Sequence, residues 1–386
     1  MSRRTNPNRH LRSILHNPVL LRQLLSPLET AVRQAISAEK ETSWFPQLPV
    51  LAHLLAGIFF QVQQLDSLRD LVTRLGVNHQ KGLLQGFAIK LSTLSKANNS
   101  PRRLRVLREV FAHLVTTSAQ SLPGSWRRLR RIAALDSTLL DCVPSATWAS
   151  YRRDVNACKG HLLFDLASSI PRHVIISTGR CHDARFFEQF QEVGWTYIVD
   201  RAYNHYHLFD QMTERKIYFV CRLKVGSVYR TVQKCRVKRA DRNRGVVHDI
   251  IVLLGAGATQ MATPVRWVRF RTSEGHVYDY ATNRLDLSPL TIAQLYEARW
   301  AIEKFFKWLK CTLRMERCLG RSAEAYEIHV LTALITDILL KLLVRLPPLA
   351  RHIPVHALRL ISEHLFAHVS RQLTLTIRSA ADTLQC

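Results

Sequence analysis

The spacing of apolar residues divides the chain into a helical N-terminal part and a mixed part. From Pro18 to about Ser121, leucines and other apolar residues recur every three or four positions, as expected of helices that each bury one face. Turn-forming stretches at 96–101 and 121–125 interrupt the pattern, and the second is the best candidate boundary. The pattern therefore predicts an all-helical region over residues 1–125.

Short runs of branched apolar residues replace this period after residue 126. Three such runs in succession, followed by alternating helical and strand-like segments, predict a mixed α/β sheet covered by helices. The expected strands are residues 131–143, 159–167, 173–178, 195–200 and 217–223, and the expected helices are 184–194 and 205–216.

Residues 223–287 show little helical period, and their alternating segments predict a β-rich insertion with a turn within 237–247. One long helix is expected next, over 291–315, with Ser288 as its N-cap and Pro289 at its first position. Further helices are expected to the end of the chain. We divide the sequence into 1–125, a core of 126–222 and 288–345, the insertion 223–287, and a helical region 346–386.

The charge balance indicates a polyanionic partner. Lys and Arg number 55 against 29 Asp and Glu, which gives a net charge of +26. Nucleic acid is the leading candidate, because displacing counterions from phosphates gives basic side chains a large binding contribution. An anionic membrane is the alternative. The longest apolar run, Pro49 to Phe60, contains His53 and falls short of the roughly 20 residues that a spanning helix needs.

Cysteine usage and the N-terminal segment indicate a cytoplasmic protein. The eight cysteines are scattered without a Cys-x-x-Cys pair, which favours reduced thiols over disulfides or a zinc site. The basic start of the chain is not followed by the apolar core and cleavage site of a secretory signal.

Two basic clusters are candidates for contact with a nucleic acid. The first part of the insertion carries nine Lys and Arg residues between Arg222 and Arg244 against a single acid, Asp241, and so dense a block is typical of a surface that follows a phosphate backbone. The second cluster precedes the 121–125 boundary, and either a solvated helix face or a phosphate-contacting face would explain it. Its members are Arg102, Arg103, Arg105 and Arg108.

Three acidic residues occupy positions that call for explanation. Asp136 lies inside an expected strand and Asp200 at the end of another, although strands disfavour Asp. Glu303 lies on the long helix, on one face with Tyr296, Arg299 and Lys310. An ordinary Arg299 to Glu303 ion pair is the alternative explanation for that face.

Three neighbouring carboxylates would repel one another unless cations lay between them. Magnesium prefers such hard oxygen ligands with positions left for water and phosphate, and two ions can stabilise both the attacking and the leaving oxygen. The acids therefore predict a metal-dependent phosphoryl-transfer site.

The motifs around these acids resemble one family, the DDE transposases of bacterial insertion sequences. Tyr296, Arg299, Glu303 and Lys310 match the spacing of the Tyr-Arg-Glu-Lys (YREK) signature of one branch. Residues 135–138 (LDST) and 200–203 (DRAY) resemble the segments that carry the family's first and second Asp. The resemblance runs from about residue 130 to 335 and includes CHDARFF at 181–187 and ATNRLD at 281–286. One departure is Ala202, where the family commonly has Gly.

The resemblance implies a ribonuclease H-like core, interrupted by a β insertion, in which Asp136, Asp200 and Glu303 are the catalytic metal ligands. The cofactor would be two Mg²⁺ ions, for which Mn²⁺ can substitute. Tyr296, Arg299 and Lys310 would contact the DNA beside the scissile bond. The family cuts the element's ends and then joins the freed 3′ hydroxyl to target DNA, so double-stranded DNA and a second copy of the chain are the expected partners, with no membrane.

Several other side chains are candidates of lower rank. Some members of the family pass through a DNA hairpin, and Trp267, Tyr278 or Tyr280 could stack on a displaced base there, although strand packing is the simpler explanation for aromatics at these positions. The remaining polar residues are interpreted mainly as structural, with Asp165 as a candidate supporting acid and Asp183 as a helix cap. They are Asp141, His161, Asp165, His182, Asp183, His205 and His207.

Two other functions would explain part of the pattern. A DNA-binding protein without catalysis shares the charge but has no need of the three acids. A metal-dependent nuclease of defence or repair shares both the charge and the acids but joins no ends. Inverted repeats bordering the reading frame would favour transposition over both.

Overall fold

The computed structural model describes residues 18–39, 48–76, 89–118, 129, 131–153, 155–318 and 320–345. Its contacts divide the chain into two compact units. The first unit comprises the described parts of 1–119, 140–158 and 307–386, and the second those of 120–139 and 159–306. The predicted 346–386 region and the 121–125 boundary lie outside the described residues.

Helices make up most of the first unit, as the apolar spacing predicts. They are α2 (Pro18–Glu39), α3 (Val50–Val62), α4 (Leu68–Gly76), α5 (Leu91–Asn98), α6 (Pro101–Ser118) and α12 (Ala323–Arg345). Helix α6 packs against both α2 and α12. The unit also holds the 3₁₀ turn Thr147–Ala149 and the short strand β2 (Ser150–Arg152), which pairs antiparallel with the start of β3. None of the described helices is long and apolar enough to cross a membrane.

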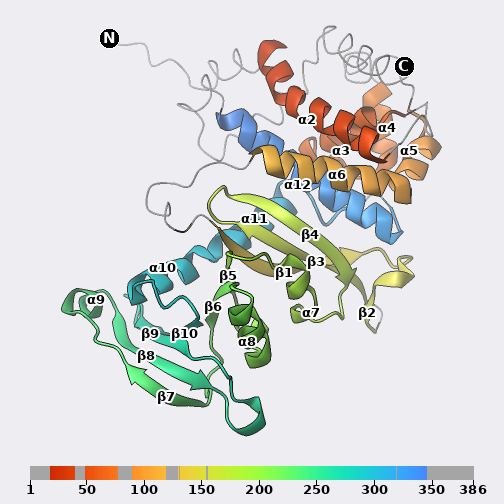
Figure 1. Ribbon diagram of the computed structural model, residues 1–386. Helices are drawn as coiled ribbons and strands as arrows, with labels where there is room; N and C mark the ends of the chain where they lie inside the picture. Colours follow the sequence, from red (N-terminus) through yellow and green to blue (C-terminus); the bar gives the residue numbers. More distant parts are fainter. Residues whose placement is uncertain are drawn as a thin grey trace, which may run out of the picture. The chain divides into compact units, whose positions relative to one another are not determined.

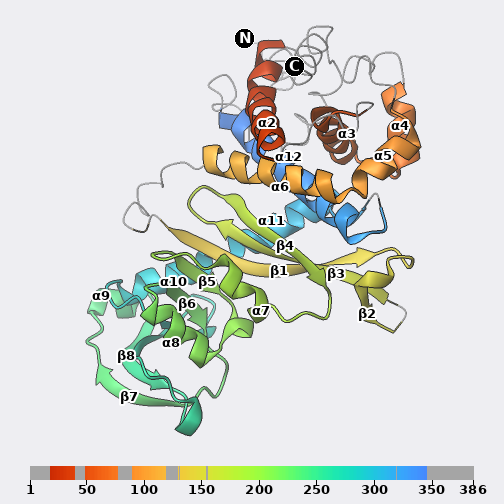
Figure 2. The same ribbon diagram turned by 45° about the vertical axis from the view of Figure 1, so that its right-hand side comes forward.

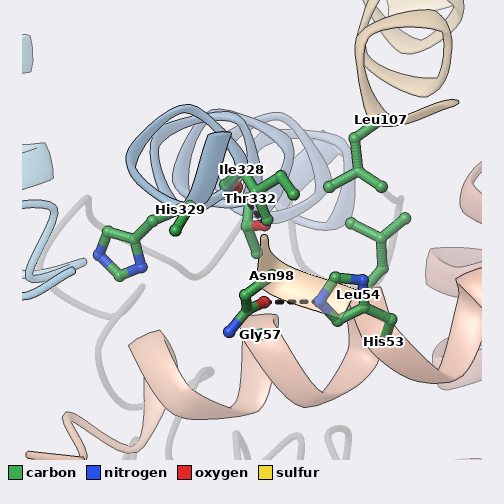
Figure 3. A pocket seen from close by; sticks show the side chains of 9 residues that line it. His53, Leu54, Gly57, Asn98, Leu107, Ile328, His329 and Thr332 are labelled. Atoms are coloured by element: carbon green, nitrogen blue, oxygen red, sulfur yellow. Dashed lines mark hydrogen bonds between the residues drawn. The ribbon is translucent and has the colours of Figure 1, made fainter. Parts of the chain in front are cut away.

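A small cavity of about 20 Å³ lies in the core of this unit, between α3, α5, α6 and α12 (Figure 3). Two fully buried histidines line it. His53 Nε2 donates to Asn98 Oδ1 at 2.7 Å, and His329, on α12, donates to the carbonyl oxygen of Arg314. Burial lowers the pKa of each histidine to about 4, so both are neutral near pH 7.

The basic cluster on α6 is engaged within the first unit. Arg103 is buried and donates to the Leu48 carbonyl at 2.6 Å. Arg105 pairs with Glu39 at 3.0 Å, and Arg108 makes a two-pronged contact with Glu327 at 2.6 and 2.7 Å. Arg105 and Arg108 therefore connect α6 to neighbouring helices while they keep about half of their side chains exposed to solvent, which agrees with the solvated helix face considered from the sequence, whereas Arg103 is buried.

The second unit is built on a mixed sheet with the strand order β3-β1-β5-β6-β10-β9-β8-β7, in which β4 pairs with β3 (Figures 1 and 2). Strands β1, β5 and β6 run parallel, and β6, β10, β9, β8 and β7 pair antiparallel. The core strands are β1 (Ile132–Cys142), β3 (Val155–Asp165), β4 (Ile170–Thr178), β5 (Thr196–Val199) and β6 (Tyr218–Arg222). The mixed α/β fold predicted from the sequence is confirmed.

Alternate residues of these strands face two separate cores. Tyr197 and Val199 of β5 pack with α7 (Ala184–Phe187) and α8 (Tyr206–Glu214), whereas Ile198 packs with α10 (Pro289–Ala298). A strand covered on both faces needs apolar residues at every position, which explains the unbroken apolar run that ends at Asp200. Helix α7 is shorter than predicted, because a 3₁₀ turn replaces the helix at Glu188–Phe190.

The insertion forms the antiparallel end of the sheet. Its elements are β7 (Tyr229–Lys234), α9 (Arg239–Asn243), β8 (Val246–Leu254), a 3₁₀ turn (Gly257–Thr259), β9 (Val265–Arg271) and β10 (Val277–Thr282). The turn expected within 237–247 contains α9 and ends at Gly245, whose φ is +105°. A Cβ there would lie 2.2 Å from the Arg271 carbonyl oxygen, so this turn requires glycine.

The long helix predicted over 291–315 is divided at Arg299 into α10 and α11 (Trp300–Cys311). The N-cap is confirmed, because Ser288 accepts from the Thr291 backbone N–H with Pro289 at the first position. Around Arg299 the bonds tighten to three-residue spacing, from Arg299 N to the Tyr296 carbonyl and from Ile302 N to the Arg299 carbonyl.

Candidate active site

Parallel pairing brings Asp136 and Asp200 to neighbouring positions. Ala134 of β1 pairs with Ile198 of β5, and each aspartate follows its paired residue by two positions. Adjacent strands lie about 4.8 Å apart, and side chains two residues apart share a face. The two carboxylates therefore leave adjacent strands at the same level. Asp200 also caps the 3₁₀ turn Arg201–Tyr203, because its Oδ1 accepts from Ala202 N at 2.8 Å.

The surroundings of Asp136 raise the pKa of its carboxyl group. Burial raises its pKa to about 6, while the Ser137 backbone N–H and Arg299 act in the opposite direction. The negative charges of Asp200 and Glu303 raise this pKa further, so both of the other acids lie within electrostatic reach of Asp136. The Ser137 N–H donates to Asp136 Oδ1 at 2.8 Å.

Arg299 connects the first acid to the third. Its Nη1 donates to Asp136 Oδ2 at 3.2 Å and its Nη2 to Glu303 Oε1 at 2.5 Å. The Arg299 side chain is 10% exposed, against 23% for Asp136 and 37% for Glu303. The i, i+4 ion pair considered from the sequence is present, but it is shared with an acid on another element.

The donor set fits a hard divalent cation. The cluster contains three carboxylates and one guanidinium, so negative charge is in excess. Two buried polar atoms beside it, Arg299 Nε and the Tyr203 hydroxyl, have no hydrogen-bond partner among the described residues. Among the described residues, no group of three Asp, Glu, His or Cys side chains is arranged as metal ligands. At this cluster, the Arg299 guanidinium lies between the carboxylates of Asp136 and Glu303.

A polar network centred on Asp183 includes Ser137, the residue that follows Asp136 on β1. The Asp183 carboxylate lies 3.3 Å from both Lys159 Nζ and His161 Nδ1. Burial raises the pKa of Asp183, but contacts with His161, Ser137 and Lys159 together lower it to about 2. Asp183 begins α7 without a side-chain cap bond, so its role differs from the predicted one. The segment CHDARFF was the only sign of this network in the sequence.

The remaining members of the YREK pattern lie in different surroundings. Tyr296 is buried, and its ring packs on Tyr280 with centroids 4.7 Å apart. Lys310 lies on α11 in the first unit and pairs with Glu316 at 3.0 Å. Trp300, at the start of α11, is 56% exposed.

The lower-ranked candidates are packed or serve local structure. Trp267 is buried and its indole N–H donates to Asp279, while Tyr280 is also buried. Tyr278 is half-buried, with the Arg222 guanidinium 4.6 Å over its ring. Asp165 accepts from the backbone N–H groups of Ala167 and Ser168 and thereby caps a turn.

A basic concavity in the insertion is a feature that the sequence indicated only as a dense charge block. It has a volume of about 640 Å³ and is lined by Arg236, Val237, Lys238, Arg239 and Arg242. Within the described chain, no ion pair to an acid neutralises its four basic side chains, although the insertion arginines Arg266 and Arg269 are each paired. The concavity therefore presents uncompensated positive charge.

Comparison with known proteins shows that the chain is similar to one family over more than half of its length. The model of the family described as "Transposase DDE domain" matches residues 127–336. The chain is 28% identical to a Sinorhizobium fredii protein named as transposase y4zB, over 64% of this chain and 70% of the relative. It is 26% identical to the Geobacillus stearothermophilus protein named as a transposase for insertion sequence element IS5377, over 61% of this chain and 63% of the relative.

Among solved structures, a cryo-EM structure of the piggyBac transposase synaptic complex with hairpin DNA is similar in outline. The likeness covers 95% of this chain and 84% of that chain, at 10% sequence identity and a TM-score of 0.45. A likeness this distant supports no statement about individual residues.

Proposed function

Because this chain belongs to the DDE transposase family, we propose that it cleaves DNA at the ends of an insertion sequence and transfers those ends into target DNA. The observation that carries the proposal is the cluster of Asp136, Arg299 and Glu303, with Asp200 level with Asp136 on the adjacent strand. A partly buried cluster with excess carboxylates and a raised pKa is typical of a functional site.

The family implies a divalent metal ion, and we propose that Asp136, Asp200 and Glu303 hold two Mg²⁺ ions, with Mn²⁺ as a substitute. Such ions supply positive charge to the attacking and leaving oxygens of phosphoryl transfer. The chain's own contribution is to fix the ligands. The parallel register of β1 and β5 sets the spacing of the two aspartates, and α11 presents Glu303 to them.

We propose that Tyr296, Arg299 and Lys310 contact the DNA beside the scissile bond, as the resemblance to the YREK branch of the family implies. Arg299 can hold a phosphate with two parallel hydrogen bonds, while Lys310 acts as a point charge. Tyr296 is buried and its ring lies against Tyr280, so it supports the shape of the site. Lys310→Ala and Arg299→Ala should both slow end cleavage and leave the fold intact, and unchanged cleavage would remove the residue from the site.

The same proposal assigns the regions of the chain. Residues 1–125 would bind the element's ends, and 126–222 with 288–345 would form the ribonuclease H-like catalytic core. Residues 223–287 would form a β-rich insertion whose basic side chains contact the DNA backbone. Two ends must be brought together for transposition, so the active species would be a homodimer on double-stranded DNA.

The test incubates purified protein and Mg²⁺ with a labelled fragment of the DNA that borders its reading frame. Asp136→Asn, Asp200→Asn and Glu303→Gln should each lower the cleavage rate roughly a thousandfold or more, because each removes a negative charge from the proposed metal site. DNA binding, measured by fluorescence anisotropy, should persist in all three. Asp141→Asn is the matched control, since Asp141 is an exposed acid on the same strand as Asp136.

An inactive wild-type protein that binds the fragment would favour a DNA-binding protein without catalysis. Cleavage without any joined product would favour a nuclease. Normal cleavage by Glu303→Gln would show that the third carboxylate is assigned to the wrong residue.

A further inference from the structure

Arg299 occupies the place between two of the proposed metal ligands. One guanidinium donates to Asp136 Oδ2 and to Glu303 Oε1, one oxygen of each of two proposed metal ligands. Arg299 is largely buried, and its Nε has no hydrogen-bond partner among the described residues. Its bonding is therefore incomplete in this position, although its charge is matched by the acids.

A guanidinium and a divalent ion compete for these oxygens. Arg has only donors and stays protonated, so it cannot itself become a ligand, and its positive charge repels a second cation placed beside it. Metal binding at these two oxygens, Asp136 Oδ2 and Glu303 Oε1, therefore requires Arg299 to leave them. A phosphate is the natural new partner, because it accepts the same two-pronged contact that a carboxylate does.

We infer that Arg299 is a displaceable counter-ion. In the DNA-free protein it bridges Asp136 and Glu303 and weakens divalent binding, and a DNA phosphate draws it away, so that DNA and metal bind cooperatively. The inference rests on the proposed function, because it takes these acids as the metal ligands. By thermodynamic linkage, the factor by which DNA raises the affinity for metal equals the factor by which metal raises the affinity for DNA.

The geometry favours release over permanent pairing. Glu303 is 37% exposed, so this half of the bridge is open to solvent and to an incoming strand. Asp200, the third acid of the cluster, is engaged with its own turn, since its Oδ1 accepts from Ala202 N. The Arg299 guanidinium lies over the Tyr296 ring, with Cζ 5.6 Å from the ring centroid. A contact with the ring face does not use the N–H donors of Arg299, so they stay available to a phosphate.

The test measures Mn²⁺ binding to the full chain by electron paramagnetic resonance, with and without a duplex of the DNA bordering the reading frame. Arg299→Gln should bind Mn²⁺ roughly tenfold more tightly than wild type without DNA, since it loses charged hydrogen bonds that compete with the ion. Arg299→Lys, which keeps the charge but not the two-pronged contact, should tighten binding to a smaller extent. Adding the duplex should tighten Mn²⁺ binding in wild type and change it little in Arg299→Gln.

Two controls separate this inference from the proposed function. Arg269→Gln removes one positive charge from the same unit, where Arg269 pairs with Asp279, and should leave Mn²⁺ binding unchanged. Asp136→Asn should lose Mn²⁺ binding, and if it binds like wild type the proposed metal site is wrong. If Asp136→Asn loses the ion while both Arg299 variants bind it no more tightly than wild type, the metal site stands and the displaceable counter-ion is refuted.

Discussion

Two arginines of the second unit bind carboxylates in opposite ways. In the insertion, Arg266 makes a two-pronged contact with Asp249 at 2.5 and 2.7 Å, and the side chains are only 11% and 2% exposed. The remaining Arg266 nitrogen donates to the carbonyls of Leu285 and Leu287. In the core, Arg299 faces two acids at once, keeps one nitrogen unpartnered, and leaves Glu303 partly open to solvent.

The difference separates an ion pair that stabilises the fold from a charged cluster that is suited to binding a ligand. The Arg266 pair matches its charges one to one and satisfies its donors, so it has nothing to offer a ligand. The Arg299 cluster has excess negative charge and incomplete bonding, which costs stability unless a further cation binds. Removing one acid from each cluster should therefore have opposite effects on the free energy of unfolding.

The largest effect is expected for Asp249→Asn. It leaves the buried Arg266 without its counter-charge and should lower the free energy of unfolding by about 3 to 5 kcal/mol. Urea denaturation of the metal-free protein measures this. Asp136→Asn is the contrasting variant and should not destabilise the protein at neutral pH. Equal losses in both variants would mean that the two clusters do not differ as described.

The pH dependence of stability sharpens the same contrast. The fold raises the pKa of Asp136 from 3.8 to about 6, so it favours the protonated form. This contribution is fully present below pH 3.8 and is lost as pH rises through about 6. The free energy of unfolding of Asp136→Asn, taken relative to that of the metal-free wild type, should therefore rise by about 3 kcal/mol between about pH 4 and pH 7.5. Parallel stability curves for the two proteins would contradict this.

A smaller effect is expected at the basic concavity, where positive charge has no acid partner. Replacing Arg236, Arg239 and Arg242 together by Gln should weaken binding to duplex DNA roughly tenfold. The slope of log affinity against log salt should fall by about 0.9 for each phosphate that the variant no longer neutralises. Fluorescence anisotropy over a salt series measures both. Arg269→Gln, whose charge is already paired, is the control, and an unchanged slope in the triple variant would exclude the concavity as a DNA-binding surface.

The smallest effect is expected for an ion pair whose acid is exposed. Arg284 contacts Asp286 at 2.7 Å, but the Asp286 side chain is 61% exposed. Asp286→Asn should change the free energy of unfolding by less than about 1 kcal/mol, because water screens and replaces such a contact. A destabilisation as large as that of Asp249→Asn would show that burial does not explain the ranking.

Much of the fold was accessible from the sequence because local patterns carry it. The helical N-terminal period, the core strands and the Ser288 cap each depend on residues close together in the chain. Element ends were less accurate. The division at Arg299 follows a local change of hydrogen-bond spacing that apolar periodicity does not record, and α7 is shorter than its apolar spacing suggested.

The candidate site was predicted in its members but not in its arrangement. Motif spacing singled out Asp136, Asp200, Glu303 and Arg299, and those assignments stay predictions until the variants are tested. The network around Asp183 could not be derived, because its residues come from separate strands and loops. The basic concavity is lined by one short stretch, 236–242, whose charge the sequence indicated but whose hollow shape only the fold created.

The sequence by itself determined which residues are apolar, which are charged, and how they are spaced along each element, and this was enough for the fold class and the family. Tertiary structure alone decided which charges meet. Arg108 and Arg266 became structural because folding placed an acid against each, while Arg299 came to share two acids that are 163 and four residues away. The role of a charged side chain depends on its distance to other charges and to water, and for residues far apart in the chain only the fold sets those distances.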